Sequence, residues 1–589
     1  MKKTLNAKKL CALLLIAAML TLSILSAAGC GKRDEDDKGA TLLMYLAGDP
    51  SNLNLDPAKL IYSAEAVKFM GLIFEGLTVM DENGKLKEGM AKKWTIVENE
   101  EKGEYKIIFE IKETKWSDGK PVTADDFVYA WKRILEPEFF SPAAPLLYSI
   151  KNARAVKEGD MTVDDLEVFA DDMRELRVEF GHKIDYDKFL ENLASIYLVP
   201  LRADTIDPKP DEWAKKPMDL LSNGPFAIKQ MEYNKATSLE RSTYYMLPGK
   251  KGENIFKYVT PYKLSLDFQR NFDQITTAYA NNDYMFYLGN VPVSRYAEFS
   301  NKAVIKNMLS SYSYHFNATK APFNNANVRK ALSIALDREE IARIAGLGVK
   351  PATGIVPHGV IDVKSTDEFR KVRGDAISPK GDIAAAKALI QSSGITPGSF
   401  ELKIRTSERG DNNEEAVAQY AAEVWGQLGF SVKVTVVKGV PFIDAIFDRD
   451  YDVIGYDDQS PGVDAFSVLA PFAKPFSGGK VTFIDEGQSI AEPYITGFQN
   501  DAYDALMEEI VAMDNDPSKR EEKLFEAEKL LVDLSPVAPL YFNVNINVTD
   551  KISGLSYSKF GYTIFTKASL KNYHQYTTED PKLAEAAED

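Results

Sequence analysis

The first thirty residues most constrain what this chain can become, because they indicate export. Four lysines (Lys2, Lys3, Lys8 and Lys9) form a basic head, an uncharged apolar run follows from Leu10 to Leu25, and small residues close the segment at Ala27 to Gly29. These are the three parts of a secretory signal. The run is shorter than the roughly 20 apolar residues that span a bilayer. We therefore expect residues 1–29 to be removed and the rest to fold outside the cytoplasm.

Cysteine usage supports this interpretation. Of the two cysteines, Cys11 lies inside the apolar run, so the mature chain keeps only Cys30 and has no internal disulfide. A cysteine directly after small residues resembles the lipobox of bacterial lipoproteins, which implies cleavage before Cys30 and a lipid on its sulfur. The alternative is an ordinary signal peptide with a chance cysteine. The charged residues up to 40 are expected to act as a flexible tether, so we assign 30–40 as the lipidated cysteine and tether.

Size and charge set two further limits. Removing 29 of 589 residues leaves 560, and because one core rarely serves more than about 300 residues, at least two domains are required. The formal charge of −16 becomes −20 once the four lysines of the signal are gone. Such an acidic chain is a poor match for nucleic acid or for anionic lipid, so we expect neither as a partner.

Helix and strand patterns alternate along the chain. Residues 105–111 alternate apolar and polar side chains, Asp118-Gly119 marks a turn, and Thr123 with Asp126 forms a capping box before a helical stripe that ends at Leu135. Similar stripes, and one strand at 430–436, recur over 328–336, 416–428, 503–511 and 524–531. Mixed helices and separated short strands predict an α/β protein built on open mixed sheets.

The chain lacks the common catalytic motifs. No phosphate loop, G-x-S-x-G or H-E-x-x-H occurs, and no two of the histidines His182, His315, His358 and His574 have helical metal-ligand spacing. Asp81 opens a sequence like the start of a calcium loop, but position five is Lys85, so Asn83-Gly84 is better interpreted as a hairpin turn. We therefore expect a binding protein and not an enzyme, with no metal or other cofactor.

The segment from Lys115 to Arg133 resembles the signature of the oligopeptide-binding proteins, the extracellular receptors of peptide ABC importers. The match runs almost without interruption through Trp-Ser-Asp-Gly-Lys-Pro-Val-Thr-Ala-Asp-Asp-Phe. Shorter matches to the same family occur at Leu55–Pro57, Phe74–Leu77, Ser222–Phe226, Tyr314–Asn317, Ala321–Phe323, Val328–Leu332 and Pro539–Tyr541. Together these matches cover residues 41 to 573, almost the whole mature chain.

The resemblance implies a type II periplasmic-binding-protein fold, with two lobes joined by a hinge and an extra domain that makes three. By these landmarks, domain I comprises 41–76, 199–309 and 539–577, domain II comprises 77–198, domain III comprises 310–538, and a polar tail follows at 578–589. The signature segment then lies in domain II, where Trp116 and Trp131 are expected in the core. The hinge crossings are expected at Tyr314–Asn317 and Pro539–Tyr541.

The resemblance also implies a function. A short peptide would be held between the lobes, paired through its backbone like a strand, and passed to the permease subunits of an ABC importer. The protein would act as a monomer, anchored through Cys30 on the bacterial cell surface or the periplasmic side of the membrane. In this family an aspartate holds the α-amine of the peptide, which is a charge-assisted contact.

This aspartate is where the chain departs from its family. The family pattern is Gly-Trp, two residues, Asp and then a Phe-Leu helix; anchoring on Phe466 puts Gly455-Tyr456 at Gly-Trp and Gln459 at the aspartate. Anchoring on Tyr451 instead leaves the aspartate unassigned. We expect the 455–464 loop to face the ligand, with Asp457 or Asp458 as the replacement acid, unless both are solvated. The expected ligand-binding residues are Gly455, Tyr456, Asp457, Asp458, Gln459, Tyr314, Asn317, Tyr62 and Ser63.

Other functions stay open at this point. Ala143 stands where some relatives present a ligand-facing tyrosine, which suggests an altered choice of ligand. Relatives of this fold bind other extended solutes, so an oligosaccharide or a metal chelate is an alternative, with Tyr312, Tyr314 and Tyr456 as the aromatic residues for a sugar. A peptide- or pheromone-sensing lipoprotein is another, and an exported peptidase is a fourth.

Overall fold

The computed structural model describes residues 40–46, 55–60, 64–210, 212–214, 220–232, 235–245, 258–281, 285–289, 291, 293–346, 348–405, 413–438, 440–485, 488–492, 495–513 and 516–570. The predicted signal peptide, Cys30, nearly all of the tether, the polar tail and the site residues Tyr62 and Ser63 lie outside them. Within the described part, no helix is both long and apolar enough to cross a membrane.

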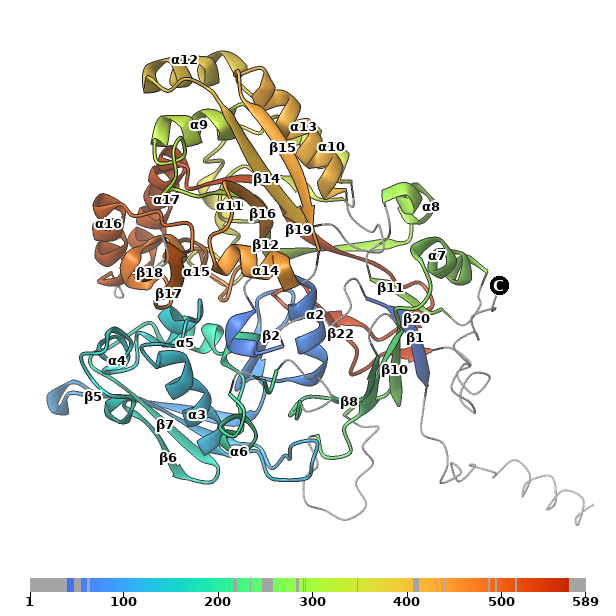
Figure 1. Ribbon diagram of the computed structural model, residues 1–589. Helices are drawn as coiled ribbons and strands as arrows, with labels where there is room; N and C mark the ends of the chain where they lie inside the picture. Colours follow the sequence, from blue (N-terminus) through green and yellow to red (C-terminus); the bar gives the residue numbers. More distant parts are fainter. Residues whose placement is uncertain are drawn as a thin grey trace, which may run out of the picture. The chain divides into compact units, whose positions relative to one another are not determined.

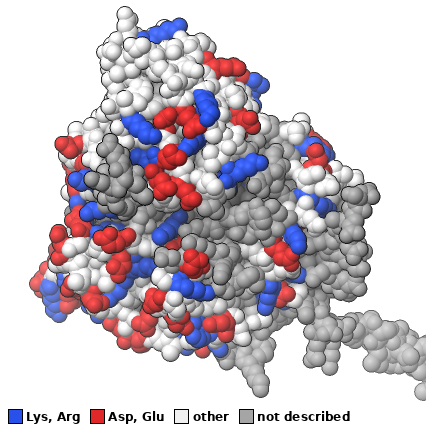
Figure 2. All heavy atoms as spheres, viewed as in Figure 1, with Lys and Arg blue, Asp and Glu red and all other residues white. Residues whose placement is uncertain are grey.

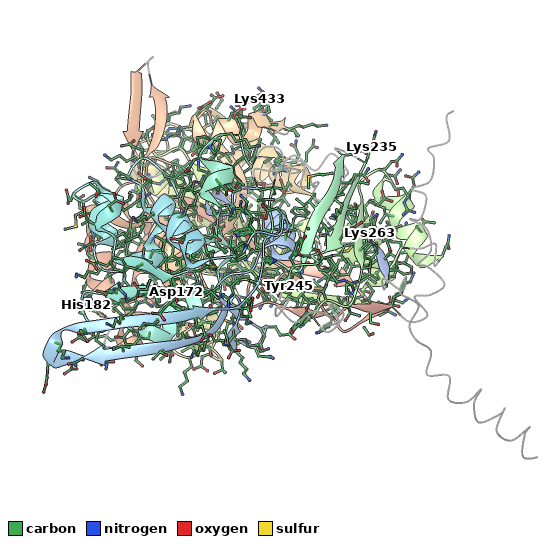
Figure 3. All side chains as sticks on the ribbon, turned by 90° about the horizontal axis from the view of Figure 1, so that it is seen from below. Asp172, His182, Lys235, Tyr245, Lys263 and Lys433 are labelled. Carbon is green, nitrogen blue, oxygen red and sulfur yellow. The ribbon has the colours of Figure 1, made fainter. Side chains whose placement is uncertain are left out.

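A mixed sheet of eleven strands organises the described part of the chain (Figure 1). Lys433 marks β15 at one edge of this sheet, and Lys235, in the turn between β8 and β9, marks the other (Figure 3). The strand order is β15 (Ser431–Val437), β14 (Ser399–Arg405), β16 (Val453–Gln459), β12 (Ala303–Phe316), β19 (Val537–Val548), β11 (Tyr287–Gly289), β1 (Thr41–Tyr45), β10 (Lys263–Asp267), β9 (Ala236–Arg241) and β8 (Phe226–Glu232), with β13 (Lys350–Pro351) added on β19.

Two long strands, β12 and β19, connect the halves of this sheet. Residues 303–307 of β12 pair with β19, and after a break in register residues 311–315 pair with β19 again, while 310–316 also pair with β16 on the other side. The break lies between Asn307 and Ser311, where an irregularity of this kind lets a strand bend. Of the two crossings that the sequence predicts, the one at 314–317 lies at the C-terminal end of β12 and the one at 539–541 lies within β19.

The strand, turn and helix that the sequence predicts between residues 105 and 135 belong to a second sheet of four strands and the helix that follows its strand β5. It contains β4 (Ala91–Asn99), β5 (Glu104–Ile111), β7 (Glu175–Phe180) and β6 (Val168–Asp172), and Figure 3 shows its β4–β5 hairpin as the long light-blue ribbon. Helix α3 (Ala124–Leu135) begins with the predicted capping box of Thr123 and Asp126. The indoles of Trp116 and Trp131 are buried and donate to Asp126 and to the Leu198 carbonyl, so both belong to the core as expected.

Other local predictions are also confirmed. Helix α13 (Glu414–Gly426), α16 (Asp501–Val511) and α17 (Pro517–Leu534) occupy the predicted stripes, and β15 occupies the predicted strand at 430–436. Asn83 and Gly84 lie in the turn between β2 (Thr78–Met80) and β3 (Leu86–Glu88), with Gly84 at a φ of 78°. Figure 2 shows acidic and basic side chains intermingled over the surface in view, although the chain carries a net charge of −16.

A group of charged side chains is buried between helix α5 (Tyr186–Asn192), the start of α15 (Ala465–Leu469) and α17. Asp464 caps α15, and Arg520 bonds both Asp464, at 3.1 Å, and Glu521, at 2.8 Å. Burial alone would raise the pKa of Asp464, but Lys188, Arg520 and the Ser467 hydrogen bonds bring this pKa down to about 2. For Glu521, burial is the larger effect, and it raises the pKa to about 7 against the opposing charge of Arg520.

Glu521 should therefore make stability depend on pH. Its pKa of about 7 in the folded state exceeds the ordinary value of 4.5, so its contribution to stability is present below pH 4.5 and is lost as pH rises through 7. We expect Glu521→Gln to remove up to about 3 kcal/mol of this decline between pH 5 and pH 8. Urea unfolding at several pH values measures it. The exposed neighbour Glu522→Gln is the control, and equal slopes in wild type and Glu521→Gln would contradict the assignment.

Candidate ligand-binding site

A cavity opens beside the C-terminal half of strand β16. Its empty volume is about 690 Å³, which includes space open to solvent at the mouth. The wall comes from segments far apart in sequence: 140–142, 309–311, 355–357, 456–477 and Ile495. Most of the wall is apolar, formed by the side chains of Phe140, Leu309, Ile355, Val468, Phe472 and Ile495.

The pairing of β16 with β12 decides which side chains reach this cavity. Asp458 lies opposite Ser311 and Tyr456 lies opposite Ser313 in an antiparallel register. Residues directly opposite each other share a face of the sheet, and successive residues point to opposite faces. Tyr456 and Asp458 therefore share one face, and both line the cavity, as do Gln459 and Ser460. The structure thus brings three of the nine predicted site residues into one cavity.

One prediction about this segment is wrong. The sequence predicts a loop over 455–464, whereas residues 455–459 continue β16 and the loop begins only at Ser460. The segment Gly-Tyr-Asp-Asp-Gln contains glycine and aspartate, which are uncommon in strands, so local propensity points away from a strand. Pairing with β12 on one side and β14 on the other overrides that propensity.

Two of the predicted ligand-binding residues, Tyr314 on the opposite face of β16 and Asn317 just after β12, lie in the core. Tyr314 is fully buried, with its ring 5.7 Å from that of Trp425 on α13. Asn317 is buried and donates to the Tyr451 carbonyl at 3.0 Å, so it fixes the chain just before β16. Neither residue lines the cavity, and we leave both out of the proposed site.

Gly455 allows the side chains on this core face to pack closely against β16. A Cβ added at Gly455 would lie 2.5 Å from the Tyr312 hydroxyl and 2.9 Å from the ring of Tyr314. The two tyrosines therefore occupy the space that any other residue at 455 would need. Gly455 acts on the site indirectly, by letting β12 and β16 pack in the register that turns Tyr456 and Asp458 toward the cavity.

Sequence reasoning did not place His315 at this site. The imidazole of His315 stacks on the ring of Tyr456, with centroids 3.7 Å apart and planes 8° apart. Its Nε2 lies 3.2 Å from Oδ2 of Asp458, and the His315 side chain is fully buried while that of Asp458 is 29% exposed. His315, which stacks on Tyr456, thus lies against the buried side of the carboxylate. This contact crosses between two strands, so no pattern within either strand could have indicated it.

The three polar residues at the end of β16, Asp457, Asp458 and Gln459, differ in the hydrogen bonds that they make. Asp457 accepts a hydrogen bond from the Asn543 amide at 2.7 Å. The Gln459 amide nitrogen donates to the carbonyls of Leu309, at 3.2 Å, and Ser460, at 3.4 Å. A carboxylate cannot donate, so an acid at 459 would leave two buried carbonyls without this donor. Among the described residues that line the cavity, Asp458 is the one carboxylate.

Buried charges hold the apolar walls in place. The Glu528 carboxylate on α17 accepts from the backbone N–H groups of Ile355 and Val356, each at 2.8 Å, and it also pairs with Arg370. On the other side, Lys157 donates to the carbonyls of residues 134, 136 and 139. These contacts fix the segments that carry Ile355 and Phe140. Burial lowers the pKa of Lys157 to about 7.

The cavity offers a carboxylate and apolar walls, and the described residues contain no group of three or more His, Cys, Asp and Glu placed to hold a metal. Residues 85–480, about two thirds of the chain, match the family model described as bacterial extracellular solute-binding proteins, family 5, middle region. The chain belongs to this family.

Individual relatives agree with this assignment. The oligopeptide-binding protein OppA of Bacillus subtilis is 27% identical over 95% of this chain and 98% of its own length. The probable deoxycholate-binding periplasmic protein YgiS of Escherichia coli is 28% identical, over 84% and 86%. The structure of Haemophilus influenzae OppA in complex with RPPGFSPFR superposes with a TM-score of 0.73 at 23% identity, over 91% and 99%. These findings confirm the predicted α/β type II periplasmic-binding fold with several domains; the exact domain boundaries stay a prediction.

The role of Gly455 can be measured as stability. We expect Gly455→Ala to lower the free energy of unfolding by about 1–3 kcal/mol, because its methyl group overlaps Tyr312 and Tyr314. Gly426→Ala, where an added Cβ meets nothing within 4 Å at the end of α13, is the matched control. It should be neutral or stabilising by up to about 1 kcal/mol. Denaturant unfolding compares the two, and equal effects would refute the packing argument.

Proposed function

We propose that this protein captures short peptides outside the cytoplasm and delivers them to an ABC importer, without chemical turnover. Membership in the extracellular solute-binding proteins supports binding and transport. The relative named oligopeptide-binding protein and the fold shared with a peptide complex support a peptide as the solute. The observation that carries the proposal is the cavity beside β16, where one carboxylate faces an apolar chamber on the strand that the family resemblance assigns to the ligand.

Membrane attachment is part of the proposal. Cleavage before Cys30 and lipidation of its sulfur would leave residues 30–40 as the tether of the binding body. We expect Cys30→Ser to abolish lipid labelling and to release the protein from the membrane fraction. Incorporation of a labelled fatty acid followed by cell fractionation measures both. Retention of label by the variant would contradict lipidation at Cys30.

Asp458 is the residue proposed to hold the peptide α-amine. It lines the cavity, whereas Asp457 accepts from Asn543 and Gln459 is neutral. His315, which stacks on Tyr456, lies 3.2 Å from the carboxylate and restricts it, which reduces the rotamer freedom lost on binding. A charge-assisted hydrogen bond of this kind contributes about 1.5–3 kcal/mol.

The amine contact can be tested with one peptide in two forms. We expect N-acetylation to weaken binding to the wild-type protein by roughly 10- to 150-fold, which corresponds to the loss of that contact. Asp458→Asn should bind the free peptide more weakly and no longer distinguish the two forms. Asp457→Asn makes the same change at the neighbouring residue, and this variant should still distinguish the free peptide from the acetylated one. Isothermal titration with the chain beginning at residue 31 gives all the affinities.

Each negative result has its own meaning. Equal wild-type affinity for free and acetylated peptide would reject the amine anchor while leaving peptide binding intact. A protein that binds no member of a peptide pool, as judged by native mass spectrometry, would reject the proposed function. Cleavage products after incubation with peptides would show that the protein is an exported peptidase instead.

A second candidate solute is an amphipathic steroid acid, because the relative YgiS is named a probable deoxycholate-binding protein and the cavity wall is largely apolar. The charge of the cavity disfavours a steroid acid, which is an anion, because the described lining contains a carboxylate and no lysine, arginine or histidine. The oligosaccharide alternative depended partly on Tyr312 and Tyr314, and both are core residues.

A further inference from the structure

We infer that a group of charged side chains buried between α5 and α17 is a pH-dependent latch between the two lobes. Closing the lobes moves one proton from solvent onto the carboxylate of Glu521, so acid favours the closed state and alkali weakens it. The latch consists of Lys188, Glu191, Asp464, Arg520 and Glu521, and none of these five described residues lines the cavity. The inference rests on the proposed function, because capture of a solute is expected to close the lobes.

The latch joins two of the predicted domains. Lys188 and Glu191 lie on α5, which belongs to predicted domain II. Asp464 caps α15, and Arg520 and Glu521 lie on α17, all within predicted domain III. The positive charge of Lys188 acts on Asp464 and on Glu521 across this boundary. A hinge movement along β12 and β19 would therefore separate the two sides of the latch and admit water between them.

Further contacts hold the same two domains together. The Ser195 hydroxyl donates to the Pro461 carbonyl. The Arg154 guanidinium binds the Glu508 carboxylate on α16, with 2.7 Å between Nη1 and Oε2. The side chains of Arg154 and Glu508 are 35% and 38% exposed, so solvent screens this pair and its contribution is small. The Glu521 side chain is 2% exposed, so its charge depends much more strongly on whether the lobes touch.

The two buried carboxylates on the α17 side of the latch are bonded unequally. Asp464 accepts from the backbone N–H and the hydroxyl of Ser467, at 3.0 and 2.5 Å, and from Arg520 at 3.1 Å. Glu521 accepts from Arg520 at 2.8 Å through Oε1, while its Oε2 has no hydrogen-bond partner among the described residues. A buried anion with an unbonded oxygen is costly, and a proton removes much of that cost. Asp464 therefore stays charged as the latch closes, and Glu521 takes up the proton.

Burial is the reason that Glu521 accepts a proton when the lobes close. Burial is the largest effect on this group, and it raises the pKa of Glu521 from 4.5 to about 7. Arg373 of α11 (Phe369–Arg373) also acts on Glu521, but its Nε and Nη2 donate to Asp362 at 2.7 and 2.9 Å. Four charged groups further shift this pKa: it is lowered by Arg520 and Lys188 and raised by Asp464 and Asp362. With the lobes apart and Glu521 in water, its pKa would return toward 4.5, so closing takes up a proton between these two values.

The experiment measures the binding of trialanine at pH 5 and at pH 7 to the chain beginning at residue 31, which retains every described residue. The ammonium group of the peptide stays largely charged at both values. We expect the wild-type protein to bind roughly 5- to 40-fold more tightly at pH 5, because closing takes up a proton at Glu521. Isothermal titration near pH 6, in two buffers of different ionisation enthalpy, should show uptake of up to about one proton per peptide bound.

Two variants identify the carboxyl group that takes up the proton. Glu521→Gln imitates the protonated carboxyl, so its affinity should change by less than about two-fold between pH 5 and pH 7, without proton uptake. Glu508→Gln is the matched control, because it removes a carboxylate from the exposed pair between the same two domains and should keep the wild-type dependence. Proton uptake by the wild-type protein is measured without any variant, so the test holds if Glu521→Gln does not fold.

The outcomes separate the latch from the proposed function. Equal wild-type affinities at the two pH values, without proton uptake, would overturn the inference and leave peptide capture intact. A pH dependence that Glu191→Gln removes and Glu521→Gln keeps would overturn the assignment to Glu521. If no peptide of the pool binds, sodium taurodeoxycholate, whose sulfonate stays charged at both pH values, is the probe: proton uptake that Glu521→Gln removes would leave the latch standing while the proposed function fails. Binding of neither solute would reject both.

Discussion

The antiparallel register between β12 and β16 is the constraint on which the site depends. It places Ser311 opposite Asp458 and Tyr314 opposite Gly455, so one face of β16 is presented to the cavity and the other to the core. Because side chains alternate, a slip of β16 by one residue would turn Asp458 away from the cavity and toward the core face of the sheet. Gly455 holds the register by leaving room for Tyr312 and Tyr314, and the alternation along the strand then defines the chemistry of the cavity.

Buried charges determine a second part of the site, the positions of its apolar walls. Glu528 and Lys157 each bond several backbone groups of a cavity wall, and the pair of Glu528 with Arg370 is almost completely buried. Buried ions add little net stability, since desolvation offsets their attraction. Their benefit here is geometric: a single side chain fixes two or three backbone groups whose positions no apolar contact would specify. The same desolvation raises the pKa of Glu521 and lowers that of Lys157 to about 7.

The sequence predicted local structure well and the site only in part. The capping box at Thr123, the alternation at 105–111 and the long match at 115–133 depend on neighbours in the chain, and these features appear as expected. The face on which Tyr314 lies, the strand at 455–459 and the contact of His315 with Asp458 depend on pairing between strands more than 130 residues apart. Such pairing leaves no trace within either segment. Gln459 could be aligned with the family aspartate, but only its two carbonyl partners explain why an amide occupies the position.

The cavity wall is built from segments that lie far apart in the sequence, and this has a consequence for secretion. Its segments extend from Phe140 to Ile495, so the chamber is complete only after strands distant in sequence have paired. Long-range pairing of this kind is slow compared with local folding. A chain still threading outward, with its C-terminal third inside the cell, has no chamber to fill. Export through the signal peptide proposed at residues 1–29 would therefore deliver a chain without a chamber, and solute binding would begin only outside the cytoplasm.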